Sequence, residues 1–303
     1  MRQRKVKNEE EKIARYNHWI VEEPTDRKGR WSEAFDEACD GAALCSSTAG
    51  AGASMGEREK DAATPELYLE IGCGKGKFIT EMARRHPDRR YVAVEGAGTV
   101  VLRALEKAAG VRATILEDDD VLADGDDDGR DERYEHVGRD ERAEELIVGE
   151  PLNNIRFITD YVQTLGDIFE KGEIRGIYLN FSDPWPKERH AKRRLTHRKY
   201  LTEYRKILSP GSILEFKSDN DDLFQFSAQE FYNFGLEILE LTDDLHGVLT
   251  GPLVPTVVTD QQGTPVKLPG PGEGAALSAQ VTTEYEDRFT EAGKNVHYCR
   301  VRF

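Results

Sequence analysis

The sequence has no long hydrophobic run, few cysteines and no excess of positive charge. No stretch approaches the ~18 consecutive apolar residues that cross a bilayer, so no membrane partner is expected. The first residues, MRQRKVKNEEEK, are charged and lack the apolar core of a secretory signal, so we expect a cytoplasmic protein. Four irregularly spaced cysteines, Cys39, Cys45, Cys73 and Cys299, exclude a disulfide framework in a chain of 303 residues. The lone CxxxxxC of Cys39 and Cys45 is a weak metal signal, and no metal is predicted to be required.

The net charge is unevenly distributed along the chain. In total, 42 Lys and Arg face 57 Asp and Glu, a net charge of -15, which spread evenly would argue against a nucleic-acid partner. However, residues 117–150 carry -12, residues 31–63 carry -5 and residues 244–282 carry -2, which leaves +4 for the rest. The segments 37–63, 117–150 and 244–282 also lack helix or strand periodicity. We therefore expect them to be loops or disordered insertions, with residues 1–30 a basic N-terminal segment and residues 64–303 a single domain.

One segment is strongly basic. Residues 187–206, KERHAKRRLTHRKYLTEYRK, hold nine Lys or Arg and two Glu, and the first fifteen residues add a net +3. A solvated helix face is the usual explanation of such a run. Here the bases cluster with His190 and His197 instead of alternating with acids, and the run follows a loop rich in proline and aromatics.

Short apolar strands alternate with amphipathic helices over most of the chain. Strands are expected at 67–71, 90–96, from 111, at 154–160, from 174, at 212–220 and at 236–244, with a last strand at the C-terminus. Helices are expected at 77–86, 99–110, 160–172, 195–208 and 222–235, and just before the last strand, while residues 209–211 should turn the chain. This order predicts an α/β fold with a parallel sheet covered on both faces. Its ligand should lie beyond the carboxyl ends of the strands.

A glycine-rich turn follows the first strand. Glu70 precedes Gly72, Gly74 and Gly76, and the second strand leads to Glu95, placed to contact ribose hydroxyls. A dinucleotide fingerprint would need glycine at position 77, where this chain has Lys77, and Glu70 would repel a pyrophosphate. An acid there suits an ammonium or a sulfonium, and E-x-G-x-G-x-G is typical of S-adenosylmethionine (SAM) methyltransferases. The alternative is a glycine turn without a ligand.

A polar and aromatic loop, Asn180 to Lys187, follows the strand IRGIYL. Asp183 can accept hydrogen bonds or stabilise positive charge, and Trp185 can stack on a base or pack under the loop. Single-stranded or extruded bases are recognised by stacking and by their hydrogen-bonding edges. The basic run begins directly afterwards, where a nucleic-acid backbone would lie.

The stretch NFSDPWPKERHAKRRL, followed by a helix and EFKSDN, resembles the signature region of bacterial tRNA (guanine-N7-)-methyltransferases. The two ends, MRQRKVKN…PTDRKGRW and TTEYEDRF…GKNVHYCRVRF, are also similar to that family, while the three acidic or low-complexity segments fall outside its pattern. The resemblance covers residues 1–36, 64–116, 151–243 and 281–303. It implies a seven-stranded, Rossmann-like SAM-dependent methyltransferase fold, mostly parallel and doubly wound, with its last strand antiparallel. It further implies methyl transfer from SAM to guanine N7 in the variable loop of tRNA. Whether the protein is a monomer or a homodimer is left open by the sequence.

The resemblance also implies residue roles. Asp183 is the expected catalytic acid, and it joins the expected cofactor contacts Glu70, Gly72, Gly74, Gly76, Glu95 and Thr159. The family often has Asn or Asp at position 159, so Asp160 could substitute for Thr159 there. The expected substrate and tRNA contacts are Lys187, Arg189, His190, Lys192, Arg193, Arg194, Asp219, Thr283, Glu284, Tyr285 and Glu286. For Asp219 the alternative is an N-cap of the helix that starts near residue 222.

Three other functions stay open from the sequence. A SAM methyltransferase acting on another RNA, a small molecule or a protein would share the glycine turn, but its substrate would have to explain the basic run. A catalytically silent tRNA-binding module would not need the intact Glu70, glycines and Asp183. A nicotinamide-dependent oxidoreductase is disfavoured by Lys77 and Glu70.

Overall fold

The computed structural model describes residues 8–36, 65–112, 146–147, 149–161, 164–247, 255–269 and 277–303. Seven strands form a central sheet in the order β5-β2-β1-β6-β7-β11-β8. Their bounds are β1 Leu67–Ile71, β2 Arg90–Val94, β5 Ile155–Ile158, β6 Ile174–Asn180, β7 Leu208–Ser218, β8 Glu237–Thr242 and β11 His297–Arg302. From β5 to β7 the neighbouring strands are parallel, and β11 is antiparallel to both β7 and β8. The mostly parallel sheet and the antiparallel last strand are therefore confirmed.

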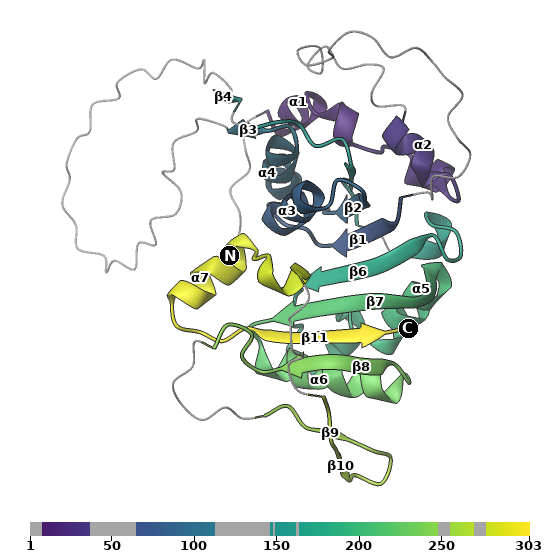
Figure 1. The fold of residues 1–303 in the computed structure, drawn as a ribbon, viewed down its shortest axis with the longest axis vertical. Coiled ribbons are helices and arrows are strands. Elements are labelled where there is room, and N and C mark those ends of the chain that lie inside the picture. Colours follow the sequence, from purple (N-terminus) through teal and green to yellow (C-terminus); the bar gives the residue numbers. More distant parts are fainter. Residues whose placement is uncertain are drawn as a thin grey trace, which may run out of the picture.

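Helices cover both faces of the sheet. One apolar core holds α3 (Lys77–Arg85) and α4 (Gly98–Ala108) against β2 and β5. The other holds α2 (Trp31–Asp36), α5 (Arg198–Ile207) and α6 (Asp221–Asn233) against β1, β6 and β7 (Figure 1). The helical spacing of the sequence explains the packing, because Phe78, Ile79, Met82 and Ala83 of α3 are all buried on one side. The expected arrangement of helices on both sides of a parallel sheet is found.

The N-terminal segment packs against the domain. It contains α1 (Glu9–Ala14), η1 (Asn17–Trp19) and η2 (Pro24–Arg27), ahead of α2. The Thr99 hydroxyl of α4 donates to the Glu9 carboxylate at 2.6 Å, and Ile20 forms a parallel bridge with Phe157 of β5. Residues 8–36 are therefore integrated into the domain through both α4 and the edge strand.

The helix predicted at 160–172 is wrong over the described residues 164–172. The chain there forms a single 3-10 turn, η4 (Leu165–Asp167). Leu165, Ile168 and Phe169 are buried, so their spacing is satisfied by one turn, and Phe169 stacks on Trp31 at a centroid distance of 5.1 Å. The turn expected at 209–211 lies inside β7, where Gly211 has a φ of 76° and the register shifts against β6.

The predicted insertions are described only in part. Residues 37–63 lie outside the described residues. The strand expected from Val111 is seen as β3 (Val111–Arg112), which pairs with β4 (Leu146–Ile147) outside the central sheet. Within 244–282, β9 (Val258–Thr259) and β10 (Pro265–Val266) form a small antiparallel pair and η6 spans Leu277–Gln280. The last helix, α7 (Glu284–Glu291), precedes β11. None of the described helices is long and apolar enough to cross a membrane.

Candidate functional site

The carboxyl ends of the parallel strands meet at one edge of the sheet. In Figure 1 the arrowheads of β1, β6 and β7 point to the side where α7 lies, whereas β11 runs the opposite way. The glycine turn, Glu95, Thr159 and the loop after Asn180 follow β1, β2, β5 and β6 at this edge. The residues that the sequence singled out are thereby brought to one region.

The three glycines of the turn are required for different structural reasons. All have positive φ angles, 78° at Gly72, 56° at Gly74 and 78° at Gly76. A β-carbon on Gly72 or Gly74 would meet no atom within 4 Å, so open space lies beside this backbone. On Gly76 it would lie 2.5 Å from the Ala104 β-carbon and 2.8 Å from the Ala104 α-carbon. Gly76 therefore permits the close packing of α3 on α4, while Gly72 and Gly74 border a cradle that could accept a ligand.

Glu95 ties the ends of the first two strands together. Its carboxylate accepts hydrogen bonds from the Gly74 amide at 3.1 Å and the Ala97 amide at 2.9 Å. The amides of Gly72 and Cys73 both donate to the Val94 carbonyl, at 2.8 and 3.1 Å. The turn is thus held in shape before any ligand binds, and the half-buried Glu95 carboxylate lies directly beside it.

Glu70 is a buried acid with an unsatisfied oxygen. Its side chain is 1% exposed; one oxygen accepts from the Asn180 amide at 2.8 Å, and Oε2 has no hydrogen-bond partner among the described residues. Burial, reinforced by the charges of Glu284 and Glu95, raises the pKa of Glu70 to about 8, although the Asn180 hydrogen bond opposes this shift. A cationic ligand group would relieve both the missing partner and the excess of negative charge.

Cys73 is buried and free within this turn. Burial raises the pKa of its thiol well above the usual value, and the nearby carboxylates of Glu70 and Glu95 add to the shift. A thiol held protonated in this way is a poor nucleophile, so Cys73 is better explained as a small residue that fills the turn.

The loop after β6 is strained and anchored. Phe181 and Trp185 have positive φ angles of 52° and 41°, which bulky residues rarely adopt. The Arg194 guanidinium donates to the carbonyls of Pro184 at 3.0 Å and Trp185 at 3.2 Å, and it lies 4.3 Å from the Phe226 ring centroid. These contacts fix the loop, which presents Asp183 to solvent.

The basic segment is divided between exposed and anchoring residues. Residues Glu188–Arg193 form the 3-10 helix η5, and the exposed cations between positions 187 and 193 are Lys187, Arg189, Lys192 and Arg193. Arg193 lies over the Trp185 ring at 4.7 Å, and the half-buried His190 meets the edge of the same ring. Arg194 is only 9% exposed, so its structural work is to hold the loop.

The first turn of α7 is clamped beside the cradle by three lysines. Lys107 of α4 pairs with Glu284 at 2.6 Å, Lys77 of α3 pairs with Asp287, and Lys217 of β7 pairs with Glu286 at 2.9 Å. The Lys217 ammonium also donates to the carbonyls of Ala279 and Val281. Three separate elements therefore fix the helix over the carboxyl edge of the sheet.

Thr283 and Glu286 have clear structural roles. They form a capping box, and Glu286 also contacts the His246 ring at 2.7 Å while having no exposed surface. Because its carboxylate is already occupied by the chain, contact of Glu286 with a substrate stays a prediction that would need rearrangement. Tyr285 is 58% exposed, and Glu284 is half-buried.

The other predicted contacts lie at strand ends. Thr159 is half-buried and Asp160 is exposed after β5. The alternative reading of Asp219 as a helix cap is wrong, because Asn220 caps α6 by accepting from the Leu223 amide at 2.8 Å. Asp219 is exposed and lies next to that cap.

Comparison with known proteins identifies the family of the chain. A family model described as "Putative methyltransferase" matches residues 64–122 and 130–263. The tRNA (guanine-N(7)-)-methyltransferase of Lactococcus lactis subsp. cremoris is 31% identical over 100% of this chain and 98% of its own length. The chain belongs to the family of tRNA (guanine-N(7)-)-methyltransferases. The enzyme of the same name from Lactiplantibacillus plantarum is 32% identical over 93% of this chain and 89% of its own length. The solved 16S rRNA methyltransferase KamB aligns at 10% identity and a TM-score of 0.42, over 78% of this chain and 87% of that one.

Two residues of this candidate site, Asn180 and Lys217, belong to no sequence motif of their own. Asn180 holds Glu70 and Lys217 holds Glu286. A lysine in an otherwise buried strand such as EFKS is a signal of a buried partner. Among the described residues, no group of three or more His, Cys, Asp or Glu could hold a metal ion.

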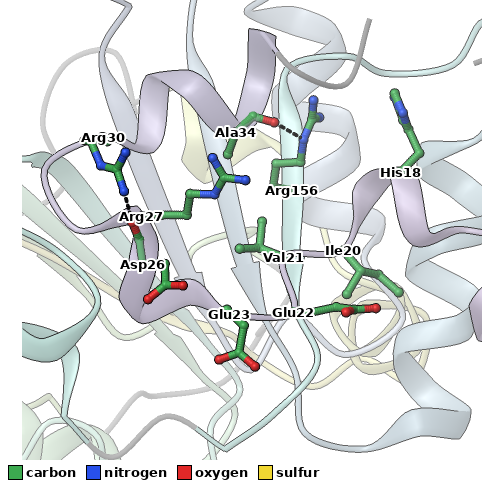
Figure 2. A pocket seen from close by; sticks show the side chains of 10 residues that line it. All are labelled: His18, Ile20, Val21, Glu22, Glu23, Asp26, Arg27, Arg30, Ala34 and Arg156. Atoms are coloured by element: carbon green, nitrogen blue, oxygen red, sulfur yellow. Dashed lines mark hydrogen bonds between the residues drawn. The ribbon is translucent and has the colours of Figure 1, made fainter. Parts of the chain in front are cut away.

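A cavity of about 600 Å³ lies elsewhere, against the N-terminal segment. Figure 2 shows its lining, in which Arg27 and Arg30 come from η2 and its neighbourhood and Arg156 from β5. Arg156 is 1% exposed and donates to the Ala34 carbonyl at 2.8 Å, so it is already engaged within the chain. None of the predicted site residues lines this cavity.

Proposed function

We propose that this chain transfers a methyl group from SAM to N7 of a guanosine in the variable loop of tRNA. The observation that carries the proposal is the buried Glu70, whose free oxygen lies at a glycine turn next to a loop followed by exposed cations. An amino acid ligand that bears both an ammonium and a sulfonium would supply the cationic partner that the Glu70 carboxylate lacks. Membership of the family supports the choice of SAM and of tRNA.

Different residues are proposed to contact different parts of the cofactor. Gly72 and Gly74 leave room for a ligand against the backbone, and Glu70 Oε2 has no partner among the described residues. Glu70 is proposed to bind the cationic amino acid portion, and Glu95 to accept hydrogen bonds from the ribose hydroxyls. Thr159 or Asp160 takes the adenine side. When bound, SAM supplies the methyl group on a sulfonium, a good leaving group.

Methylation of guanine N7 requires no proton transfer to the protein before attack. Guanine N7 has an in-plane lone pair and no proton to lose, so no general base is required before attack. The protein must align N7 with the methyl carbon and tolerate a base that becomes cationic. Asp183 is proposed to stabilise that charge, and Asp219 to accept hydrogen bonds from the guanine N1–H and 2-amino group, neither of which adenine has.

The exposed cations Lys187, Arg189, Lys192 and Arg193 are proposed to contact tRNA phosphates. His190 stays a predicted contact at the edge of the same surface. Arg194 is proposed to act indirectly, because its guanidinium holds the carbonyls of the loop that carries Asp183.

The test is incubation of the protein with methyl-labelled SAM and unmodified tRNA, followed by nucleoside analysis. Label in 7-methylguanosine is expected, and Asp183→Ala and Asp219→Ala should each lower turnover. Label on a small molecule or on protein would contradict the proposal. SAM binding without transfer would instead indicate a catalytically silent tRNA-binding module.

A further inference from the structure

An aromatic cluster borders the loop that carries Asp183. Phe181, Tyr285 and Phe289 lie together: the ring centroids of Phe181 and Tyr285 are 6.1 Å apart, those of Tyr285 and Phe289 are 5.3 Å apart, and Phe181 stacks on Phe289 at 6.4 Å with an interplanar angle of 14°. Phe181 comes from the end of β6, whereas Tyr285 and Phe289 share one face of α7 because they are four residues apart. The cluster is called the aromatic ledge below.

One residue of the aromatic ledge is exposed to solvent. Phe181 and Phe289 are half-buried, but Tyr285 is 58% exposed. In the described part of the chain only three large hydrophobic side chains are exposed, Tyr285, Tyr161 and Val257. Phe181 precedes the proposed catalytic Asp183 by two residues, so the exposed Tyr285 ring lies against the start of the loop that carries this aspartate.

The ledge is also rigid. Tyr285 lies between Glu284 and Glu286, whose carboxylates are paired with Lys107 and Lys217, so the backbone beneath its ring is fixed from both sides. Phe181 keeps its unfavourable φ of 52°, and its amide donates to the Lys217 carbonyl at 3.0 Å. Such strain persists where surrounding contacts impose it, and it is concentrated at functional sites. A ring fixed in advance loses little entropy when a partner stacks on it.

We propose that the aromatic ledge is a stacking platform for a nucleobase of the substrate tRNA, with Tyr285 in contact with the base and Phe181 and Phe289 as positioning residues. This inference rests on the proposed function, and it specifies how the base is held. The cations of the basic segment supply sequence-independent attraction to phosphates, and the ledge supplies a neutral contact that only an unstacked base can use. The base is thereby presented beside Asp183.

The first test compares Tyr285→Ala with Tyr285→Phe, using an unmodified tRNA transcript. Base stacking on an aromatic ring contributes enough that its loss should weaken tRNA binding roughly 5- to 100-fold in Tyr285→Ala. The KM for SAM should not change, and Tyr285→Phe should keep most of the affinity because a ring remains. Val257→Ala is the matched control, since Val257 is exposed directly before β9, which lies away from α7 (Figure 1).

Salt dependence distinguishes stacking from charge contact. In Tyr285→Ala the slope of log affinity against log salt should equal that of the wild type, whereas Lys192→Ala should reduce the slope by about 1. In a separate variant, Tyr285→Trp, the introduced indole should be quenched when the tRNA transcript binds.

Several results would contradict the proposed role of the aromatic ledge and leave the methyltransferase proposal unaffected. These are unchanged tRNA affinity in Tyr285→Ala, an equal loss in Tyr285→Phe, a raised KM for SAM, or no quenching in Tyr285→Trp. Failure of the proposed function would appear differently, as absence of 7-methylguanosine with the wild-type protein.

Discussion

At the scale of single residues, Glu70 is the most informative group of the site. The folded protein raises its pKa from 4.5 to about 8, chiefly because the side chain is removed from water. The unliganded acid is thus mostly protonated at neutral pH, and a cationic ligand that favours its ionised form must displace that proton.

We expect the affinity for SAM to rise with pH as Glu70 ionises, up to about pH 8, and to level off above it. Glu70→Gln should bind more weakly and lose the part of the pH dependence that belongs to this carboxyl. Calorimetric titration of both proteins with SAM across pH 5.5–9 measures the difference between their affinities. The titration of SAM itself affects both proteins equally and cancels in that difference. Identical pH profiles would show that Glu70 does not face the cation.

The glycines give a second residue-scale prediction. Gly74→Ala and Gly76→Ala both force alanine into a positive φ, at a cost of about 1 kcal/mol. Only Gly76→Ala also drives a β-carbon against the Ala104 backbone. Thermal unfolding should therefore show a larger loss of stability for Gly76→Ala, whereas Gly74→Ala should chiefly impair SAM binding. Equal losses of stability would contradict the structural role assigned to Gly76.

At the scale of elements, α7 depends on one buried ion pair more than on its exposed ones. Lys217 and Glu286 have 2% and 0% of their side chains exposed, and burial lowers the pKa of Lys217 while Glu286 opposes that shift. Removing one partner leaves the other charge buried and unpaired.

We expect Lys217→Met to destabilise the protein by about 3–5 kcal/mol in denaturant unfolding. Lys107→Met is the control: it removes an ion pair at the surface of the same helix turn and should cost less than about 1 kcal/mol. If the two variants lost equal stability, the buried pair would not be the main anchor of α7.

The elements could mostly be predicted because their signals are local. The apolar spacing of Phe78, Ile79 and Met82 indicates α3, and Gly110 marks the end of α4. The failure at 164–172 has a physical cause, since Leu165, Ile168 and Phe169 fit one 3-10 turn as well as a helix. Glu286, the partner of Lys217, is 69 residues away, so no local pattern could reveal this ion pair or the aromatic ledge on the helix that it anchors.

At the scale of the whole molecule, charge is divided between the domain and its insertions. Residues 117–150 carry -12, whereas residues 187–206 carry +7. The total of -15 conceals a basic surface beside the proposed site. Sequence was sufficient to find this division, and the structure adds that Arg194 belongs to the loop anchor instead of the free cations.

We expect deletion of residues 117–145, which keeps β4, to strengthen tRNA binding at low salt because it removes negative charge that repels phosphates. The effect should fade at high salt, where the Debye length is only ~3 Å. Filter binding of the tRNA transcript across a salt series measures it. An unchanged affinity and salt slope would show that this segment does not influence tRNA binding.

The most direct measurement of the whole account is the position of the new methyl group. A tRNA transcript methylated by the wild-type protein should contain 7-methylguanosine in its variable loop when fragments are analysed by mass spectrometry, and Asp183→Asn should form far less of it under the same conditions. Methylation at another base or another atom, or undiminished product with Asp183→Asn, would contradict the account.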